Sequence, residues 1–300
     1  MTDDSATTAV GSASGPQLFG HPRGLATLFL TEMWERFTYY GMRAILVLYL
    51  VAAIDKGGLG LDDKTGNAIY GLYISGTYLL SVFGGWIADR LTGAQRAVWW
   101  GGILITIGNA LLALGQTQLF FFGLVLIVFG VGLLKPNISA IVAQLYPEGG
   151  SRRDAGFSIF YMGINLGAFV GSTLVPLFQS WWGWNIAFGS SALFMLIGLV
   201  QFRYTRHYLG SAGLSPGVSQ ADTGARRNAW LAVIVITGVM LAVAVASITG
   251  AMHIDATKLL EGSFWAMMVF SVLYFAYLLF FAGLDGTERK RILVMIALFV

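Results

Sequence analysis

The chain has 300 residues, of which 56% are hydrophobic and only 11% are charged. Soluble domains carry about 25% charged residues, so this composition favours an integral membrane protein. The absence of cysteine excludes disulfides and thiolate metal sites. The formal net charge is only +3, and the basic residues form short clusters between apolar runs, which indicates membrane topology rather than a nucleic-acid-binding surface.

The chain begins with a polar segment and continues as a series of long apolar runs. Residues 1–22 are mostly small or polar and lack the pattern of a signal peptide, so we expect a disordered cytoplasmic tail. About 20 apolar residues are enough for a transmembrane helix. The runs predict an all-α integral membrane protein with spans at 24–53, 65–88, 97–116, 119–144, 156–179, 185–208, 228–250 and 262–284, and the start of another near residue 291.

A change of composition separates the first six predicted spans from the rest. The segment 209–227 is rich in Gly, Ser, Ala and Asp, which is typical of an interdomain linker. We expect a six-helix bundle at 23–208, the linker, a helix pair at 228–285, and at 286–300 a cytoplasmic loop with the start of a further bundle. The chain is therefore expected to be part of a longer protein.

The lysines and arginines of the loops and the adjoining span ends are unevenly distributed between the two sets of alternating loops. One set contains only Lys56, Lys64 and Lys258. The other set contains Arg23, Arg90, Arg96, Arg152, Arg153, Arg203, Arg206, Arg226, Arg227, Arg289, Lys290 and Arg291. Because cytoplasmic loops carry the excess of positive charge, we expect the N-terminus in the cytoplasm of a multi-pass protein.

Charged residues interrupt the middle of the first predicted span. A single charge at the centre of a membrane helix costs roughly 2.5 to 3.5 kcal/mol on insertion scales. At 100° per residue, one face of the helix carries what we call the charged stripe, with Tyr40 at its edge. The charged stripe consists of Glu32, Glu35, Arg36, Tyr39 and Arg43. It must face protein or water rather than lipid.

Two interpretations of the charged stripe remain open. Glu32 and Arg36 are spaced as a self-neutralising i,i+4 pair, but a structural salt bridge leaves Glu35 and Arg43 unexplained. Alternatively, two carboxylates beside an arginine form a coupled titrating group whose proton occupancy depends on nearby charge. A proton bound there would be exchanged for an anionic ligand held by Arg36, Arg43 or another cation.

Two further polar residues lie deep in predicted spans. Lys135 lies about sixteen residues from one end of the fourth span, next to Pro136, which loosens the helix. We favour a pathway-lining lysine over one that extends harmlessly to the membrane interface. Asn165 lies about ten residues into the fifth span, which suggests a buried hydrogen bond or a ligand contact.

The end of the second span combines small and charged residues. Gly84 and Gly85 would let neighbouring helices approach closely. Asp89 and Arg90 fit either a contact with neighbouring helix ends or a solvated loop, and the sequence favours neither.

Nothing in the sequence indicates enzyme chemistry. The three histidines are scattered outside the spans or at a span end, and no Gly-x-x-x-x-Gly-Lys phosphate-binding loop is present. We therefore expect neither an enzyme nor an ATP-driven pump, and no metal or organic cofactor.

Four segments together resemble the bacterial type of the proton-dependent oligopeptide transporter (POT) family, a branch of the major facilitator superfamily. Residues 32–41 look like the first-helix E-x-x-E-R motif of that family, with Glu32, Glu35 and Arg36 in place. Residues 84–98 and 157–169 resemble its two signatures, and Lys135 falls at its fourth-helix lysine. The linker and helix pair also resemble the two helices that many bacterial members insert between their six-helix halves.

The resemblance implies proton-coupled import of di- and tripeptides across the bacterial inner membrane by alternating access. Glu32, Glu35 and Arg36 would then couple protons, and Gly84, Gly85, Asp89 and Arg90 would have structural or gating roles. The implied partners are peptide, protons and the lipid bilayer. The implied substrate-binding residues are Arg36, Tyr39, Tyr40, Arg43, Tyr70, Lys135 and Asn165. Alternatives are a related transporter of nitrate, conjugates or peptide-like drugs, and a membrane sensor that binds peptides without moving them.

Overall fold

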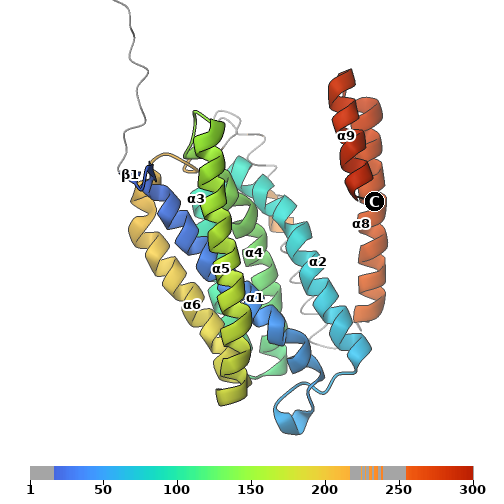
Figure 1. The fold of residues 1–300 in the computed structure, drawn as a ribbon. Coiled ribbons are helices and arrows are strands. Elements are labelled where there is room, and N and C mark those ends of the chain that lie inside the picture. The colour runs from blue at the N-terminus through green and yellow to red at the C-terminus, as the bar shows by residue number, and fades with distance from the viewer. Residues whose placement is uncertain are drawn as a thin grey trace, which may run out of the picture.

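The structure is a computed structural model that describes residues 17–216 and 255–299, together with isolated helical positions between 224 and 238. The described chain is almost entirely helical (Figure 1). The helices are α1 (Arg23–Val51), α2 (Asp63–Ile87), α3 (Ala94–Leu112), α4 (Thr117–Gln144), α5 (Gly150–Trp182), α6 (Trp184–Thr205), α8 (Ala256–Phe281) and α9 (Gly286–Phe299). The first six follow the six predicted spans in order, whereas most of the span predicted at 228–250 lies outside the described residues.

The helix bounds differ from the predicted spans mainly at the polar ends. The largest difference within the bundle is at α5, which begins at Gly150 rather than at residue 156. Hydropathy detects only the apolar part of a helix, and the first turns of α5 carry Arg152 and Arg153. At the other extreme, α3 ends at Leu112 rather than at residue 116, and Gly115 in the following turn adopts a left-handed φ of 70°.

Part of the predicted disordered tail is ordered. Gln17–Leu18 (β1) and His21–Pro22 (β2) pair as a short antiparallel hairpin. Residues from distant segments hold it in place: Arg152 donates a hydrogen bond of 2.9 Å to the Gly20 carbonyl, and His21 Nδ1 lies 2.8 Å from the Tyr146 hydroxyl. The expectation of a disordered tail over 1–22 is therefore corrected for residues 17–22, because composition does not reveal such long-range contacts.

Five of the described helices are long and apolar enough to cross a membrane. They correspond to α2, α4, α5, α6 and α8. The first helix differs because it carries the charged stripe, yet it is deeply buried, and its residues Leu28, Met42 and Leu46 are in the central apolar core. The charges of α1 are thus buried at the centre of the bundle, and the apolar helices around it keep them away from lipid, as a membrane protein requires.

The six helices pack as two groups of three: α1 with α5 and α6, and α4 with α2 and α3. Helices α3 and α6 contact each other. Exchanging α1–α3 with α4–α6 leaves this set of contacts unchanged, as expected for the internal three-helix repeats of transporters.

Glycines create the closest approaches in this arrangement. A Cβ atom on Gly84 of α2 would lie 2.0 Å from the carbonyl oxygen of Gly132 on α4. In the equivalent α1–α5 contact, a Cβ on Gly171 would lie 2.2 Å from the Phe37 carbonyl oxygen. Small residues let membrane helices pack backbone to backbone, and here they fix α2 and α5 against the two central helices.

The described part of the predicted helix pair lies outside the six-helix bundle. Figure 1 shows α8 beside α2, and α9 lies against α8. Leu260 of α8 lies against Gly71 of α2. Most of the side chains of α8 are exposed, including Phe264, Trp265 and Phe270, as expected for a helix that faces lipid.

The first part of the predicted linker is packed against the bundle. Leu209 is buried, and the Gln95 side chain of α3 donates a hydrogen bond of 2.7 Å to the Ala212 carbonyl. Residues 210–216 therefore continue the bundle structurally, although their composition indicated a linker. Most of the remaining linker, up to residue 227, lies outside the described residues.

Candidate functional site

The charged stripe of α1 is buried and paired within its own helix. The Arg36 Nε atom forms an ion pair with Glu32 Oε1 at 3.1 Å and donates a hydrogen bond to Glu35 Oε2. The three side chains are at most 4% exposed. The structural salt bridge considered from the sequence therefore exists, but it includes both carboxylates, so Glu35 is not left without a partner.

This ion cluster does not satisfy all of its own polar atoms. Glu32 Oε2, Glu35 Oε1 and Arg36 Nη2 are buried and have no hydrogen-bond partner in the structure. Buried polar atoms are nearly always hydrogen-bonded, because an unpaired one costs free energy. The cluster also has one positive charge for two carboxylates, so its charges are not balanced when both carboxylates are ionised. A site of this kind can hold a proton on one carboxylate or accept an anionic ligand at the arginine.

Tyrosines surround the cluster on the α1–α2 side. The Arg36 guanidinium lies 4.9 Å from the centroid of the Tyr39 ring, and Tyr39 stacks on Tyr73 of α2 at 6.1 Å. Tyr40 contacts the edge of Tyr39 at 5.2 Å. The predicted positions of Tyr39 and Tyr40 next to Arg36 are therefore as expected from helical spacing. Tyr39 is buried, and Tyr40 is half-buried.

Arg43 belongs to a different environment from Arg36, although the two residues share one helix. Its Nε donates a hydrogen bond to the hydroxyl of Tyr70, and its guanidinium lies 5.5 Å from the centroid of that ring. Arg43 is half-buried and forms no ion pair with any described carboxylate. Helix α2 thus places Tyr70 next to Arg43.

Lys135 lies on α4, where its ammonium group rests on an aromatic ring. Its Nζ is 4.1 Å from the centroid of Tyr78 on α2. Lys135 is half-buried and has no ion pair among the residues described. The neighbouring Asn137 fixes α4 to α2 by donating a hydrogen bond of 3.1 Å to the Gly84 carbonyl. The lysine therefore faces α2 in the middle of the bundle and does not extend along α4 to a helix end.

For Asn165, the sequence suggested either a buried hydrogen bond or a ligand contact, and the buried hydrogen bond is not formed. Its side chain is exposed, with no hydrogen bond to any described residue. Gly163 and Gly167 of α5 face α1, and a residue two positions from each points away from α1. The prediction of a buried hydrogen bond is wrong, whereas a ligand contact stays a prediction.

The end of α2 separates into a packed part and an exposed part. Gly84 is in the close contact with α4, whereas a Cβ on Gly85 would find its nearest neighbour, Pro136 Cβ, at 3.8 Å. Asp89 and Arg90 are exposed, in a π-helical turn at Ala88–Thr92. Arg90 lies 5.8 Å from the Trp86 ring of its own helix. This geometry favours a solvated turn in the described residues over a contact between helix ends.

Three contacts in the site were not assigned from the sequence. Tyr73 stacks on Tyr39, and its buried hydroxyl has no hydrogen-bond partner in the described residues. The Lys135 ammonium lies over the Tyr78 ring, and Gly132 packs against Gly84. Tyr70 and Tyr73 are spaced by three residues, a signal that places both on one helical face. No local signal connects Tyr78 with Lys135. Within the described residues, no group of three or more His, Cys, Asp or Glu is arranged to hold a metal ion.

The helical bundle with a buried charged cluster defines an integral membrane protein with a polar site between its helices, the class that includes the secondary transporters. More specifically, the chain belongs to the POT family, whose sequence profile matches residues 95–300. The predicted family and fold class are thereby confirmed.

Two relatives illustrate the similarity in sequence. Transporter YclF of Bacillus subtilis is 41% identical over 284 residues, which are 94% of this chain and 56% of YclF. Peptide transporter YePEPT of Yersinia enterocolitica is 38% identical over 305 residues, covering 98% of this chain and 59% of the relative. The chain thus spans somewhat more than half the length of the curated relatives it matches.

Solved structures of the family show the same arrangement. A variant of the peptide transporter POT in complex with alafosfalin matches 95% of this chain with a TM-score of 0.83 and 42% identity, over 57% of its own chain. A POT family transporter in complex with 5-aminolevulinic acid matches 94% of this chain with a TM-score of 0.84 and 37% identity, over 58% of its own chain. These relatives are transporters, which agrees with the expectation of a transporter rather than an enzyme.

Proposed function

We propose that this protein is a proton-coupled symporter that imports di- and tripeptides by alternating access. One observation carries the proposal: two buried carboxylates share Arg36, while the cations Arg43 and Lys135 rest on tyrosine rings without a carboxylate partner in the described residues. The relatives support the substrate class, since YePEPT is named a peptide transporter and the Lactococcus lactis relative a di-/tripeptide transporter.

The geometry suggests how a proton and a peptide would be coupled. When both carboxylates are ionised, they compete with any anionic ligand for Arg36. Binding a proton to Glu32 or Glu35 removes one negative charge from the cluster, so Arg36 attracts a peptide carboxylate more strongly. Because linkage is reciprocal, a bound peptide carboxylate in turn favours the protonated cluster. Protons would be the coupling ion, with no cofactor.

In this proposal, the remaining residues bind the peptide or shape the path. Arg43 and Lys135 attract the peptide carboxylate together with Arg36. Gly84 permits the close approach of α2 and α4, and Asp89 and Arg90 act at the end of α2 during gating. The proposed lining of the peptide pocket is Tyr39, Tyr40, Tyr70 and Asn165.

We further propose that the protein is a multi-pass protein of the bacterial inner membrane with its N-terminus in the cytoplasm. The support is the excess of Arg and Lys in the loops on the N-terminal side of the bundle. The proposed partners are peptide, protons and the lipid bilayer, and no nucleic acid.

A second substrate class has specific support. A family transporter was solved with 5-aminolevulinic acid, and another with alafosfalin, so the binding of small amino-acid-like or peptide-like compounds is the competing proposal for this chain. Nitrate transport and peptide sensing without transport are the further alternatives.

The test is uptake of labelled dialanine by proteoliposomes that contain the full-length protein, with and without an inward proton gradient. We expect accumulation only with the gradient. Transport of 5-aminolevulinic acid without transport of dialanine would select the competing proposal, and binding without uptake would indicate a sensor.

Two variants assign the roles within the site. Glu35→Gln should abolish gradient-driven accumulation but preserve counterflow exchange, because exchange needs no net proton movement. Loss of both would indicate that the ion cluster is only structural. Lys135→Ala should raise the KM for dialanine, whereas Lys258→Ala, which changes an exposed lysine of α8, should leave the KM unchanged.

A further inference from the structure

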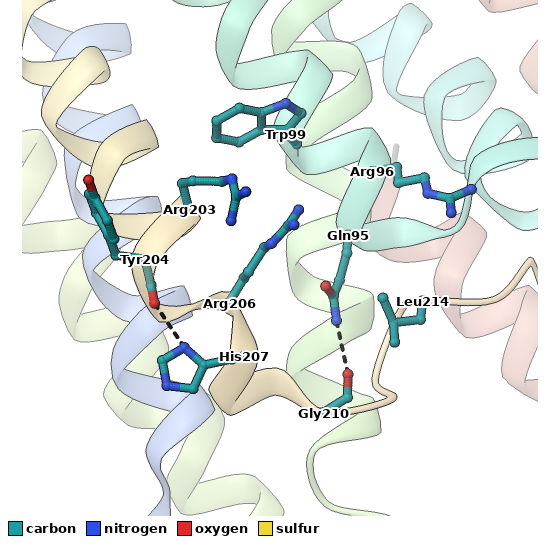
Figure 2. Close-up of a pocket in the computed structure, with 9 residues that line it drawn as sticks. All are labelled: Gln95, Arg96, Trp99, Arg203, Tyr204, Arg206, His207, Gly210 and Leu214. Carbon is teal, nitrogen blue, oxygen red and sulfur yellow. Dashed lines mark hydrogen bonds between the residues drawn. The ribbon is translucent and has the colours of Figure 1, made fainter.

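A basic cavity lies at the end of the bundle, away from the charged stripe. It has a volume of about 560 Å³ and is formed by α3, α6 and the segment that follows α6. Figure 2 shows the side chains that line it. The principal ones are Arg96, Trp99, Arg203, Tyr204, Arg206 and His207. Among the described residues, no acidic side chain lines this cavity.

The arginines of the cavity are not neutralised by any carboxylate of the part of the chain that the structure describes. Arg203 and Arg206 reach from α6 and the turn after it toward Gln95 and Trp99 of α3, and Arg96 lies at the far rim (Figure 2). None of these arginines forms an ion pair with any carboxylate in residues 17–216 and 255–299. The cavity therefore presents unpaired positive charge that favours an anion.

The floor of the cavity is fixed by hydrogen bonds. Gln95 is buried, and its side chain donates to the carbonyl oxygens of Ala212 at 2.7 Å and Gly210 at 3.4 Å. The backbone N–H of Gly213 donates to Gln144 Oε1 at 2.7 Å. These contacts attach the segment after α6 to α3 and α4, so the basic side chains are presented on a defined surface.

An apolar groove continues from the basic cavity between α3 and α6. It has a volume of about 540 Å³ and shares Trp99, Arg203 and Tyr204 with the basic cavity. The remaining lining is aliphatic: Ile103, Leu196, Leu199 and Val200. The shared Trp99 stacks on Phe202 at 6.5 Å. An anion-attracting end thus leads directly into an apolar channel on the outer side of two spans.

We propose that these two adjoining cavities bind one anionic phospholipid, with its phosphate against Arg203 and Arg206 and an acyl chain in the apolar groove. The proposal rests on the proposed membrane orientation but not on peptide transport. Basic clusters next to membrane spans attract anionic headgroups, and Trp and Tyr prefer the level of the headgroups. A soluble anion would use the basic cavity but not the groove, and a neutral lipid would use the groove but not the arginines.

The test measures lipid binding to the full-length protein in detergent by native mass spectrometry. Dioleoyl phosphatidylglycerol is titrated against dioleoyl phosphatidylcholine of equal chain length. We expect tighter binding of the anionic lipid. Arg203→Gln with Arg206→Gln should weaken it on the order of twentyfold, since each basic residue near a membrane surface contributes about a fivefold change in affinity.

The matched control removes the same charge outside the cavities. Arg153→Gln with Arg289→Gln changes two exposed arginines of the same loop set, and binding of phosphatidylglycerol should stay within about twofold of the wild type. Equal losses in the two double variants would overturn the proposal in favour of a diffuse charge effect. The single variant Arg206→Gln, with an expected loss of roughly fivefold, replaces the double variant if the latter does not fold.

Two further measurements separate the lipid from other ligands. Val200→Trp should fill the apolar groove and weaken phosphatidylglycerol binding while all arginines remain. Glycerol 3-phosphate, which has the phosphate without the chains, should not compete at millimolar concentration. Competition by glycerol 3-phosphate with no effect of Val200→Trp would assign the cavity to a soluble phosphate ligand. Equal binding of both lipids by the wild type would also overturn the proposal.

Discussion

Two sets of charged residues in the bundle differ in their burial and in the partners that stabilise them. On α1, Arg36 is enclosed with Glu32 and Glu35, and its one positive charge partly compensates the two carboxylates within one helix. Across the α1–α2–α4 side, Arg43 and Lys135 are only half-buried, and each is supported by a tyrosine ring. The first set is an ion cluster, and the second consists of cations held by neutral partners.

The difference in partners suits the two sets to different roles. A carboxylate partner would neutralise a cation and compete with an anionic ligand, whereas a tyrosine ring holds a cation and leaves its charge available. The enclosed cluster is suited to a change of protonation, and the two supported cations are suited to attract a ligand carboxylate. Variants that remove one partner at a time test this difference in roles.

The largest effect is expected from Arg36→Met. It removes the partner of two buried carboxylates, and breaking a buried ion pair typically destabilises a protein by roughly 3 to 5 kcal/mol. The thermal unfolding temperature of the detergent-purified protein should therefore fall strongly. Arg43→Met is the matched control on the same helix and should lower it much less, since Arg43 has only a neutral partner. Equal decreases would remove the distinction between the two sets.

The second prediction concerns the contact that holds Lys135 and Tyr78 in position. Gly84→Ala places a Cβ 2.0 Å from the Gly132 carbonyl oxygen, so α2 and α4 must separate. Overpacking of this kind costs about 1 to 3 kcal/mol. The adjacent Gly85→Ala should be close to neutral, because its Cβ meets its nearest neighbour only at 3.8 Å. Thermal unfolding compares the two variants, and similar stability of both would contradict the close contact.

A smaller effect is expected at the ring that supports Lys135. Tyr78→Leu removes the cation–π contact, which is worth about 0.5 to 2 kcal/mol, so the KM for dialanine should rise roughly 2- to 30-fold. Tyr78→Phe keeps the ring and should leave the KM within about twofold of the wild type. If the phenylalanine variant is as impaired as the leucine variant, the hydroxyl rather than the ring matters.

The smallest effect is expected outside both sets, at the N-terminus of α2. Asp62 accepts a hydrogen bond of 3.0 Å from the Thr65 backbone N–H. Hydrogen bonding from Thr65 lowers the pKa of Asp62 below its ordinary value of 3.8. The ionised cap therefore stabilises α2 above that value, and this stabilisation is lost as the pH falls through the lowered pKa.

The measurement is the difference in unfolding temperature between the wild type and Asp62→Ala as a function of pH. A small decrease at pH 7 should disappear as the carboxylate is protonated. Asp62→Asn, which keeps the capping oxygen without the charge, should show no pH dependence from this site. A pH-independent effect of the alanine variant would show that the cap contributes through its shape alone.

The sequence predicted those parts of the site that belong to one helix. Helical spacing placed Glu32, Glu35, Arg36 and Tyr39 on one face, and the cost of exposing them to lipid required that face to be buried. The first six spans followed from apolar runs in the same way. Both inferences depend on neighbours within a few residues, which is the range over which sequence patterns are informative.

Contacts between helices were not predictable to the same extent. Lys135 and Tyr78 are 57 positions apart in the sequence, and nothing local to either residue indicates the other. The exposure of Asn165 depends on which face of α5 meets α1, and two glycines decide that face. The ordered hairpin at 17–22 depends on Tyr146 and Arg152.

The sequence by itself determined the membrane class, the order of the first six spans, the family and the charges that have to be buried. These properties follow from composition, periodicity and motifs along one chain. Only the tertiary structure decided which partner each charge receives: Arg36 two carboxylates, and Arg43 and Lys135 a tyrosine each. The reason is physical, because Coulomb and cation–π energies depend on distances across helix interfaces, and close packing at glycines sets those distances.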